Sequence, residues 1–174
     1  REERAKMSAL VFNNPHLIGP LLEIAFAVDN PISNRACWVL EFTVKNEISL
    51  ILPFIDHFTS SISNLRQESS IRPMAKICEI LIKAYFSKTE NEAQLVLSEN
   101  HLEKITTACF DWLIGNHKVA AKAYSMTCLL LLGRKFDWIH PELKMVIEKN
   151  YGQGSAAYKA RARHTLDKLK RKGL

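Results

Sequence analysis

The stretch PLLEIAFAVDNPISNRA, residues 20–36, describes two helices joined by a short turn. Apolar residues at three- and four-residue spacing lead into the turn Asp29-Asn30-Pro31, which is predicted to end the first helix and begin the second. The second helix opens with an apolar residue, two variable residues, a basic residue and an alanine, from Ile32 to Ala36. The same opening, with methionine once in place of the basic residue, recurs at residues 71–75, 119–123 and 158–162.

The alanines that end these four openings lie 39, 48 and 39 residues apart. Periods of this length are typical of arrays of helical pairs, in which each pair stacks on the next. The spacing predicts one all-α domain over residues 1–174, with no strand-like alternation anywhere in the sequence. The predicted segments are a capping helix at 1–12, repeats at about 14–45, 48–86, 101–133 and 137–171, and an insertion at 87–100.

Local signals place several helix starts. Within the insertion, Thr89-x-x-Glu92 is a capping-box pattern that predicts a short extra helix. Pro73 is predicted to lie in the first turn of a helix that starts at Ile71, where no intrahelical donor is required. Asp137 is predicted to cap the first helix of the last pair.

The segment from Pro20 to Ala36 resembles a HEAT repeat, with proline in the first helix, aspartate in the turn and an alanine-containing entry to the second helix. The other units match less completely, since none has an acid equivalent to Asp29 and Lys104 replaces the proline in the third. The resemblance covers about residues 15–170. It implies a right-handed α-α superhelix whose second helices line a concave surface, and it implies no reaction.

The chain is also similar to short bacterial HEAT-like proteins that automated naming labels adenylosuccinate lyase. Its residues do not support that label. The lyase loop Ser-Ser-x-Met-Pro-x-Lys-x-Asn is missing from the sequence, and the chain has less than half the length that such an enzyme needs.

No motif predicts catalysis, a cofactor or a metal. The four cysteines, at positions 37, 78, 109 and 128, have no histidine at ligand spacing and are predicted to be reduced core thiols. The segment Tyr151–Ser155 contains G-x-G without a preceding strand or a third glycine. Apolar runs reach only five residues, as at 128–132, which is too short to cross a membrane, so we expect a cytoplasmic protein. Because residue 1 is arginine, we expect a fragment or a missing leader.

The net charge of +6 lies entirely at the C-terminal end. Residues 155–174 contain seven basic residues and one acidic residue, whereas residues 1–154 contain 17 of each. On a helical wheel, an apolar stripe through Tyr158, Ala162 and Leu169 is flanked by cations on both sides. The favoured interpretation is a solubilised end cap, and the alternative is a patch for phosphates or an acidic partner.

Three cations occupy the same repeat position, Arg35, Lys122 and Arg161, and a methionine takes it in the remaining repeat. This row either faces a ligand on the concave surface or lies between repeats, where it would pair with acids such as Glu41 and Glu79. The inter-repeat interpretation is favoured. Burial distinguishes the two, because guanidinium groups exposed in one groove would indicate a ligand.

The sequence favours a non-enzymatic module that binds a protein or peptide on its concave helical surface, with no membrane partner. The alternative is nucleic-acid binding through the basic C-terminal helix, with a similarity to HEAT-like DNA alkylation-repair glycosylases in the pairs Asp111-Trp112 and Asp137-Trp138. A neutral body is poorly suited to tracking many phosphates, which favours the protein partner. The predicted contact residues are Arg35, Lys122, Arg161, Arg163, Lys168, Lys170 and Arg171.

Overall fold

The computed structural model describes residues 2–171 and 173, apart from the side chain of Arg4. Within these residues the chain forms ten α-helices and four short 3-10 turns, and no strand. The all-α prediction is therefore confirmed. Arg1 of the predicted capping helix and Lys172 of the basic end lie outside the described residues.

The helices follow one another as an N-terminal helix and four successive pairs, with one short helix inserted between the second and third pairs. The 3-10 turns are Pro15–Leu17, Ile48–Leu50, Leu52–Phe54 and Ile62–Asn64. Two of them open the second predicted repeat, 48–86, so its first α-helix begins only at Ile55. The helices are α1 (Glu2–Asn13), α2 (Ile18–Phe26) with α3 (Ser33–Asn46), α4 (Ile55–Ser61) with α5 (Glu68–Tyr85), α6 (Glu92–Val96), α7 (Glu99–Ile114) with α8 (Val119–Leu132), and α9 (Ile139–Tyr151) with α10 (Ala156–Lys170).

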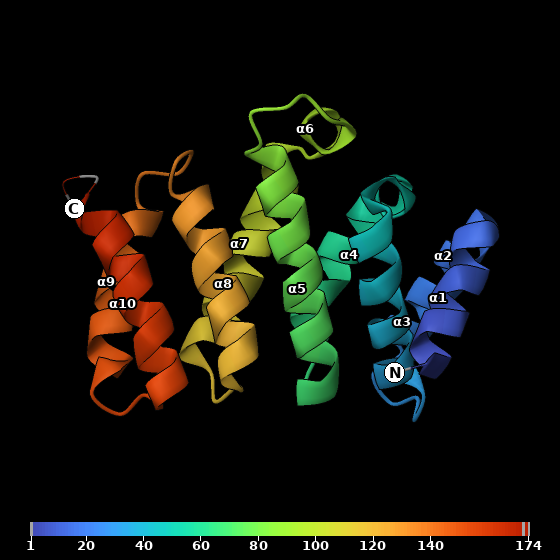
Figure 1. Cartoon of the computed structure of the whole chain (residues 1–174), viewed down its shortest axis with the longest axis horizontal. Helices are drawn as coiled ribbons and strands as arrows, with labels where there is room; N and C mark the ends of the chain where they lie inside the picture. Colours follow the sequence, from blue (N-terminus) through green and yellow to red (C-terminus); the bar gives the residue numbers. More distant parts are fainter. Residues whose placement is uncertain (1, 172, 174) are drawn as a thin grey trace.

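The pairs stack in sequence order along the long axis of the molecule (Figure 1). The second helices form one layer, the B layer, in which α3 packs on α5, α5 on α8 and α8 on α10, while α1 packs on α3. The first helices, α2, α4, α7 and α9, form the A layer. Here Phe26 of α2 meets Phe58 of α4 edge-on at 6.1 Å, and Phe110 of α7 stacks on Trp138 at 5.7 Å.

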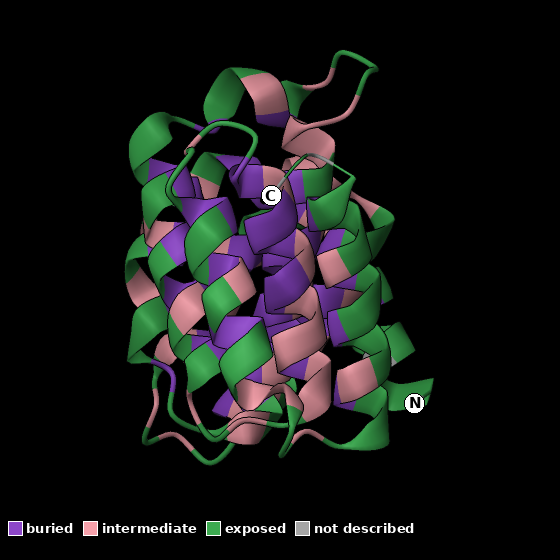
Figure 2. Cartoon of the chain, turned by 90° about the vertical axis from the view of Figure 1, so that its left-hand side faces the viewer, coloured by how far each residue is buried: buried purple, intermediate pink, exposed green. Residues whose placement is uncertain are grey.

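The core lies between the two layers. Seen from the C-terminal end, buried residues lie mainly towards the middle of the molecule and exposed residues mainly along its outer sides (Figure 2). Among the largest fully buried side chains are Leu22, Leu40, Phe58, Met74 and Leu102, which come from both layers. Each such burial stabilises the fold by about 1.5–3 kcal/mol. The four cysteines lie in this core as free thiols, as the sequence predicts, and burial raises the pKa of Cys37 to about 11.

Pro73 does not lie in the first turn, so that prediction is wrong. Helix α5 begins at Glu68, three residues earlier than predicted, and Pro73 is buried inside the helix. The missing N–H leaves the carbonyl of Ser69 without its usual helical partner. Because Ser69 is exposed at the start of the helix, its carbonyl lies near water and the proline is tolerated.

Two predicted caps are also wrong. In the insertion, Asn91 rather than Thr89 precedes the short helix, and its backbone N–H donates to the Gln94 side chain at 3.1 Å. The Gln94 amide then donates to the carbonyl of Tyr85 at 3.2 Å, which fastens the insertion to the end of α5. Helix α9 is preceded by Trp138 without a side-chain cap, so Asp137 does not cap it.

Carboxylate contacts join successive pairs. The Glu68 carboxylate of α5 accepts the backbone N–H of Lys118 at 3.0 Å and is hydrogen-bonded to His117 Nδ1. Burial alone would raise the pKa of Glu68. The hydrogen bonds from Lys118 and His117 outweigh burial, so the pKa of Glu68 lies below its usual value. The His101 ring bonds the Asp56 carboxylate at 2.7 Å, and this hydrogen bond holds the pKa of Asp56 below its usual value.

These contacts predict a loss of stability in acid. A carboxyl whose pKa is lowered in the fold stabilises the chain above its unfolded pKa, which is about 4.3 for Glu, and the stabilisation disappears as pH falls through the folded pKa. We expect the free energy of unfolding, measured with urea, to fall between about pH 5 and pH 3. In Glu68→Gln this fall should be smaller, and in Glu103→Gln, at an exposed site, it should match the wild type. An equal fall in the free energy of unfolding for the wild type and both variants would contradict the assignment to Glu68.

No helix among the described residues combines the length and the apolar character that crossing a lipid bilayer requires.

Candidate functional site

Cations lie over aromatic rings at all three junctions of the B layer. The Arg72 guanidinium of α5 lies 4.4 Å from the ring centroid of Trp38 in α3. Lys76 Nζ of α5 lies 4.8 Å from the ring of Tyr124 in α8. Lys122 Nζ of α8 lies 6.0 Å from the ring of Tyr158 in α10. These six side chains are named the cation–aromatic row, and all except the buried Tyr158 are partly exposed.

Two of the cations are held by acids. Arg72 Nη1 donates to Glu41 Oε2 at 3.1 Å across the α3–α5 junction, and the Glu41 side chain is only 8% exposed. Burial raises the pKa of Glu41 despite the opposing charge of Arg72. Lys76 Nζ lies 2.6 Å from Glu79 Oε2, and Lys83 binds the other oxygen at 2.8 Å. Burial opposes ionisation of Glu79, but these two lysines outweigh burial and lower its pKa.

Lys122 differs from the other two cations. No carboxylate of the described chain lies within ion-pair distance of its ammonium. The charge of Glu68 acts on Lys122, but the Glu68 carboxylate is bonded to His117 and to the Lys118 amide. Burial lowers the pKa of Lys122, and Glu68 opposes this shift. A partly desolvated cation without an ion pair is a physical signal of a binding position.

The three cations predicted as one row do not meet. Lys122 belongs to the cation–aromatic row, whereas Arg35 and Arg161 are exposed, and neither has an ion pair or a ring contact in the described chain. The predicted pairing with acids between repeats is therefore wrong for these residues. The acids do pair, but Glu41 binds Arg72 and Glu79 binds Lys76 and Lys83.

The predicted contact residues at the basic end of the chain are all exposed, and two of them line one cavity. Arg163 and Lys170 line a shallow cavity of about 380 Å³ beside α9, together with Glu148 and Asp167. Both acids reduce the positive potential there. The other predicted contact residues at this end of the chain, Arg161, Lys168 and Arg171, are exposed and do not line this cavity.

Sequence reasoning missed most of the row. Of its six side chains, only Lys122 was predicted as a contact residue. The rings have no common register, because Trp38 follows its repeat alanine by two residues, Tyr124 by one, and Tyr158 precedes its alanine by four. The one available signal was the spacing of Arg72 and Lys76, which places two cations on one face of a helix.

No protein-family model, curated protein or solved structure matches the chain. Within residues 2–171 and 173, no group of three or more His, Cys, Asp or Glu side chains is placed to hold a metal ion. The HEAT resemblance of residues 15–170 therefore stays a prediction, and function is inferred from the geometry of the B layer.

Proposed function

We propose that the protein is a non-enzymatic module that binds a segment of a partner protein on the outer surface of the B layer. In this proposal the four pairs form a HEAT-like, right-handed superhelix, and the B helices line its concave side. The repeated helix openings and the stacking of α3, α5, α8 and α10 in sequence order support that architecture.

The cation–aromatic row is the observation that carries the proposal. Trp, Tyr and Arg are the side chains most enriched where protein interfaces concentrate their binding energy. Here Trp38, Arg72 and Tyr124 are held partly exposed on helices that pack directly against one another. Rigid support of such side chains reduces the entropy that is lost when a partner binds.

The row also indicates the chemistry of the partner. Lysine and arginine groups over partly exposed rings attract carboxylates and offer apolar surface in the same place. The preferred partner segment is therefore acidic and carries at least one aromatic or large aliphatic side chain. Nucleic acid fits less well, because tracking many phosphates needs a surplus of cations, and residues 1–154, which include five of the six side chains of the row, contain 17 basic and 17 acidic residues.

Selection of random peptides on the immobilised protein tests this function. We expect recovered peptides to be enriched in Asp, Glu and aromatic residues, and to bind Tyr124→Ala about tenfold more weakly than the wild type, or about 1.4 kcal/mol. Lys168→Gln/Lys170→Gln is the matched control, because it removes positive charge outside the row, and it should bind like the wild type. Equal affinity for Tyr124→Ala would contradict the proposal.

A salt titration distinguishes nucleic-acid binding from the proposed peptide binding. Binding of a nucleic acid through α10 predicts an affinity that falls steeply with salt and is lost in Lys168→Gln/Lys170→Gln. The proposed function predicts that this variant keeps its peptide affinity and that the wild type shows no tight binding to single- or double-stranded oligonucleotides. Loss of peptide affinity in the α10 variant would favour the alternative.

A further inference from the structure

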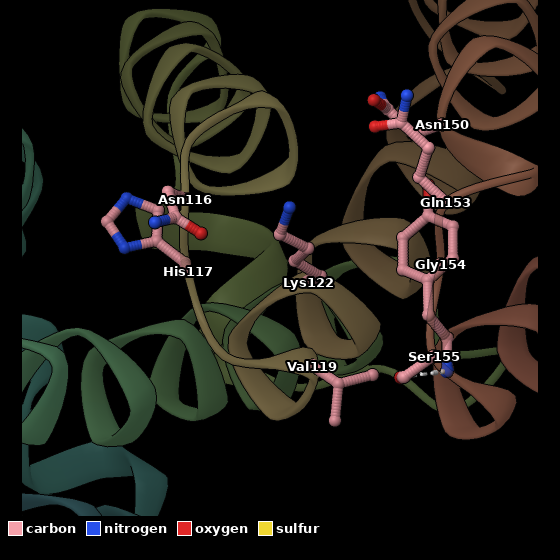
Figure 3. A pocket seen from close by; sticks show the side chains of 9 residues that line it. Asn116, His117, Val119, Lys122, Asn150, Gln153, Gly154 and Ser155 are labelled. Carbon is pink, nitrogen blue, oxygen red and sulfur yellow. Dashed lines mark hydrogen bonds between the residues drawn. The ribbon is translucent and has the colours of Figure 1, made fainter.

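A cavity of about 340 Å³ lies where the α7–α8 turn faces the α9–α10 turn. Figure 3 shows Lys122 extending its ammonium into the space between Asn116 on one side and Asn150 with Gln153 on the other. His117 forms part of the wall, with its imidazole nitrogens directed away from Lys122. The volume is in the range of sites for small molecules.

The described residues that line the cavity carry positive charge and no negative charge. None of the described residues that line it carries a carboxylate, and Lys122 is its one lining lysine or arginine. Glu68, the acid behind the His117 wall, has its two oxygens bonded to His117 and to the Lys118 amide. The ammonium of Lys122 therefore faces the cavity without a counter-ion from the described chain.

Two helices begin at the edge of the cavity. Val119 is the first residue of α8 and Ser155 precedes α10, and both line the cavity. The N-terminal ends of helices carry partial positive charge and unpaired N–H groups that favour anions. Both α8 and α10 have more than a dozen residues, and the Glu68 carboxylate on the Lys118 N–H offsets part of the terminal charge of α8.

Tyr158 provides an independent indication of a ligand. Its side chain lines the cavity and is 5% exposed, and its buried hydroxyl has no hydrogen-bond partner. Buried polar groups in folded proteins are almost always hydrogen-bonded. Gly154 allows the ring to lie against the turn, because a Cβ at that position would lie 2.4 Å from Tyr158 Cδ1.

We propose that this cavity binds a small ligand through an oxyanion, a phosphate or carboxylate group, that pairs with the Lys122 ammonium. The Tyr158 hydroxyl and the side-chain amides of Asn116 and Gln153 supply neutral hydrogen bonds to the ligand. The cavity is larger than one oxyanion, so the remaining volume holds the polar body of the ligand. The site takes a small molecule and does not depend on the peptide binding proposed above.

Titration of the ¹⁵N-labelled protein with inorganic phosphate and with acetate, each at constant ionic strength against chloride, tests the site. We expect saturable shifts of the amide signals of residues 116–122 and 153–158 with at least one of the two anions, at concentrations up to about 50 mM. The anion that saturates at the lower concentration identifies the preferred group. Shifts that stay linear with both anions would overturn the proposal.

Two conservative variants and a control assign the binding to its residues. Lys122→Met should weaken the saturating anion about tenfold or more, and Tyr158→Phe should weaken it about threefold. Because the Tyr158 hydroxyl has no partner in the fold, Tyr158→Phe should keep the melting temperature of the wild type. Lys168→Met, which removes an exposed charge of α10 outside the cavity, should bind like the wild type. Equal affinity in Lys122→Met and the wild type would overturn the assignment.

Discussion

Alanine in place of Gly133 should destabilise the protein by about 2–4 kcal/mol. Gly133 ends α8 with ordinary helical backbone angles, so the backbone itself accepts alanine. The obstacle is His140 of α9, because a Cβ at position 133 would lie 2.1 Å from the Cδ2 atom of its ring. The ring is buried and bonds the Leu130 carbonyl at 2.9 Å, so moving it leaves that carbonyl without this partner. The contact between the third and fourth pairs would open.

Gly152→Ala is the matched control for this prediction. Gly152 also ends a helix with helical angles, but a Cβ there meets nothing within 4 Å. This change should leave stability unchanged or raise it by about 0.4–1 kcal/mol, because alanine restricts the unfolded chain. Urea unfolding at pH 7 measures both free energies. Similar values for the two variants would show that His140 is not fixed against α8.

Methionine in place of Arg72 should destabilise the fold by about 2–3 kcal/mol at pH 7. The change leaves the Glu41 carboxylate buried with no ion-pair partner in the described chain. Breaking a buried ion pair costs about 3–5 kcal/mol, and the smaller figure reflects the exposure of Arg72, whose side chain is 34% exposed. The cation over the Trp38 ring is lost as well.

The pH dependence identifies the cause. Burial already raises the pKa of Glu41, and without Arg72 this pKa should rise further. A raised carboxyl pKa destabilises the fold at high pH, and the destabilisation disappears as pH falls and the carboxyl gains its proton. The stability difference between Arg72→Met and the wild type should therefore shrink from pH 7 to pH 4. Glu41→Gln/Arg72→Met should recover most of the loss, and a double variant no more stable than Arg72→Met would refute the buried-charge explanation.

Sequence periodicity was sufficient for the helices and their order. The repeated apolar positions mark the faces on which the helices pack, and the repeat alanines 36, 75 and 162 are buried there, whereas Ala123 is only partly buried. Helix starts were less predictable where tertiary contacts decide them. Pro73 lies inside α5 because that helix begins at Glu68, whose carboxylate contacts the turn before α8, some fifty residues later in the chain.

The binding surface was predictable only in part for a related reason. Equivalent positions in a repeat share a helix position, but the length and direction of each side chain decide what it reaches on the neighbouring helix. Arg35 and Arg161 share the register of Lys122, yet neither has a ring in contact, whereas Arg72 lies over Trp38 from a different register. The cavity at Lys122 could not be predicted from the sequence either, because it forms between two turns that are separated by more than thirty residues.

The location of a bound peptide tests the central claim most directly. A peptide recovered by selection would carry a nitroxide spin label, and broadening of amide signals in the ¹⁵N-labelled protein would map its position. We predict broadening along the outer surface of α3, α5, α8 and α10, centred on Trp38, Arg72 and Tyr124. Broadening confined to α2, α4, α7 and α9 would contradict the proposed binding surface.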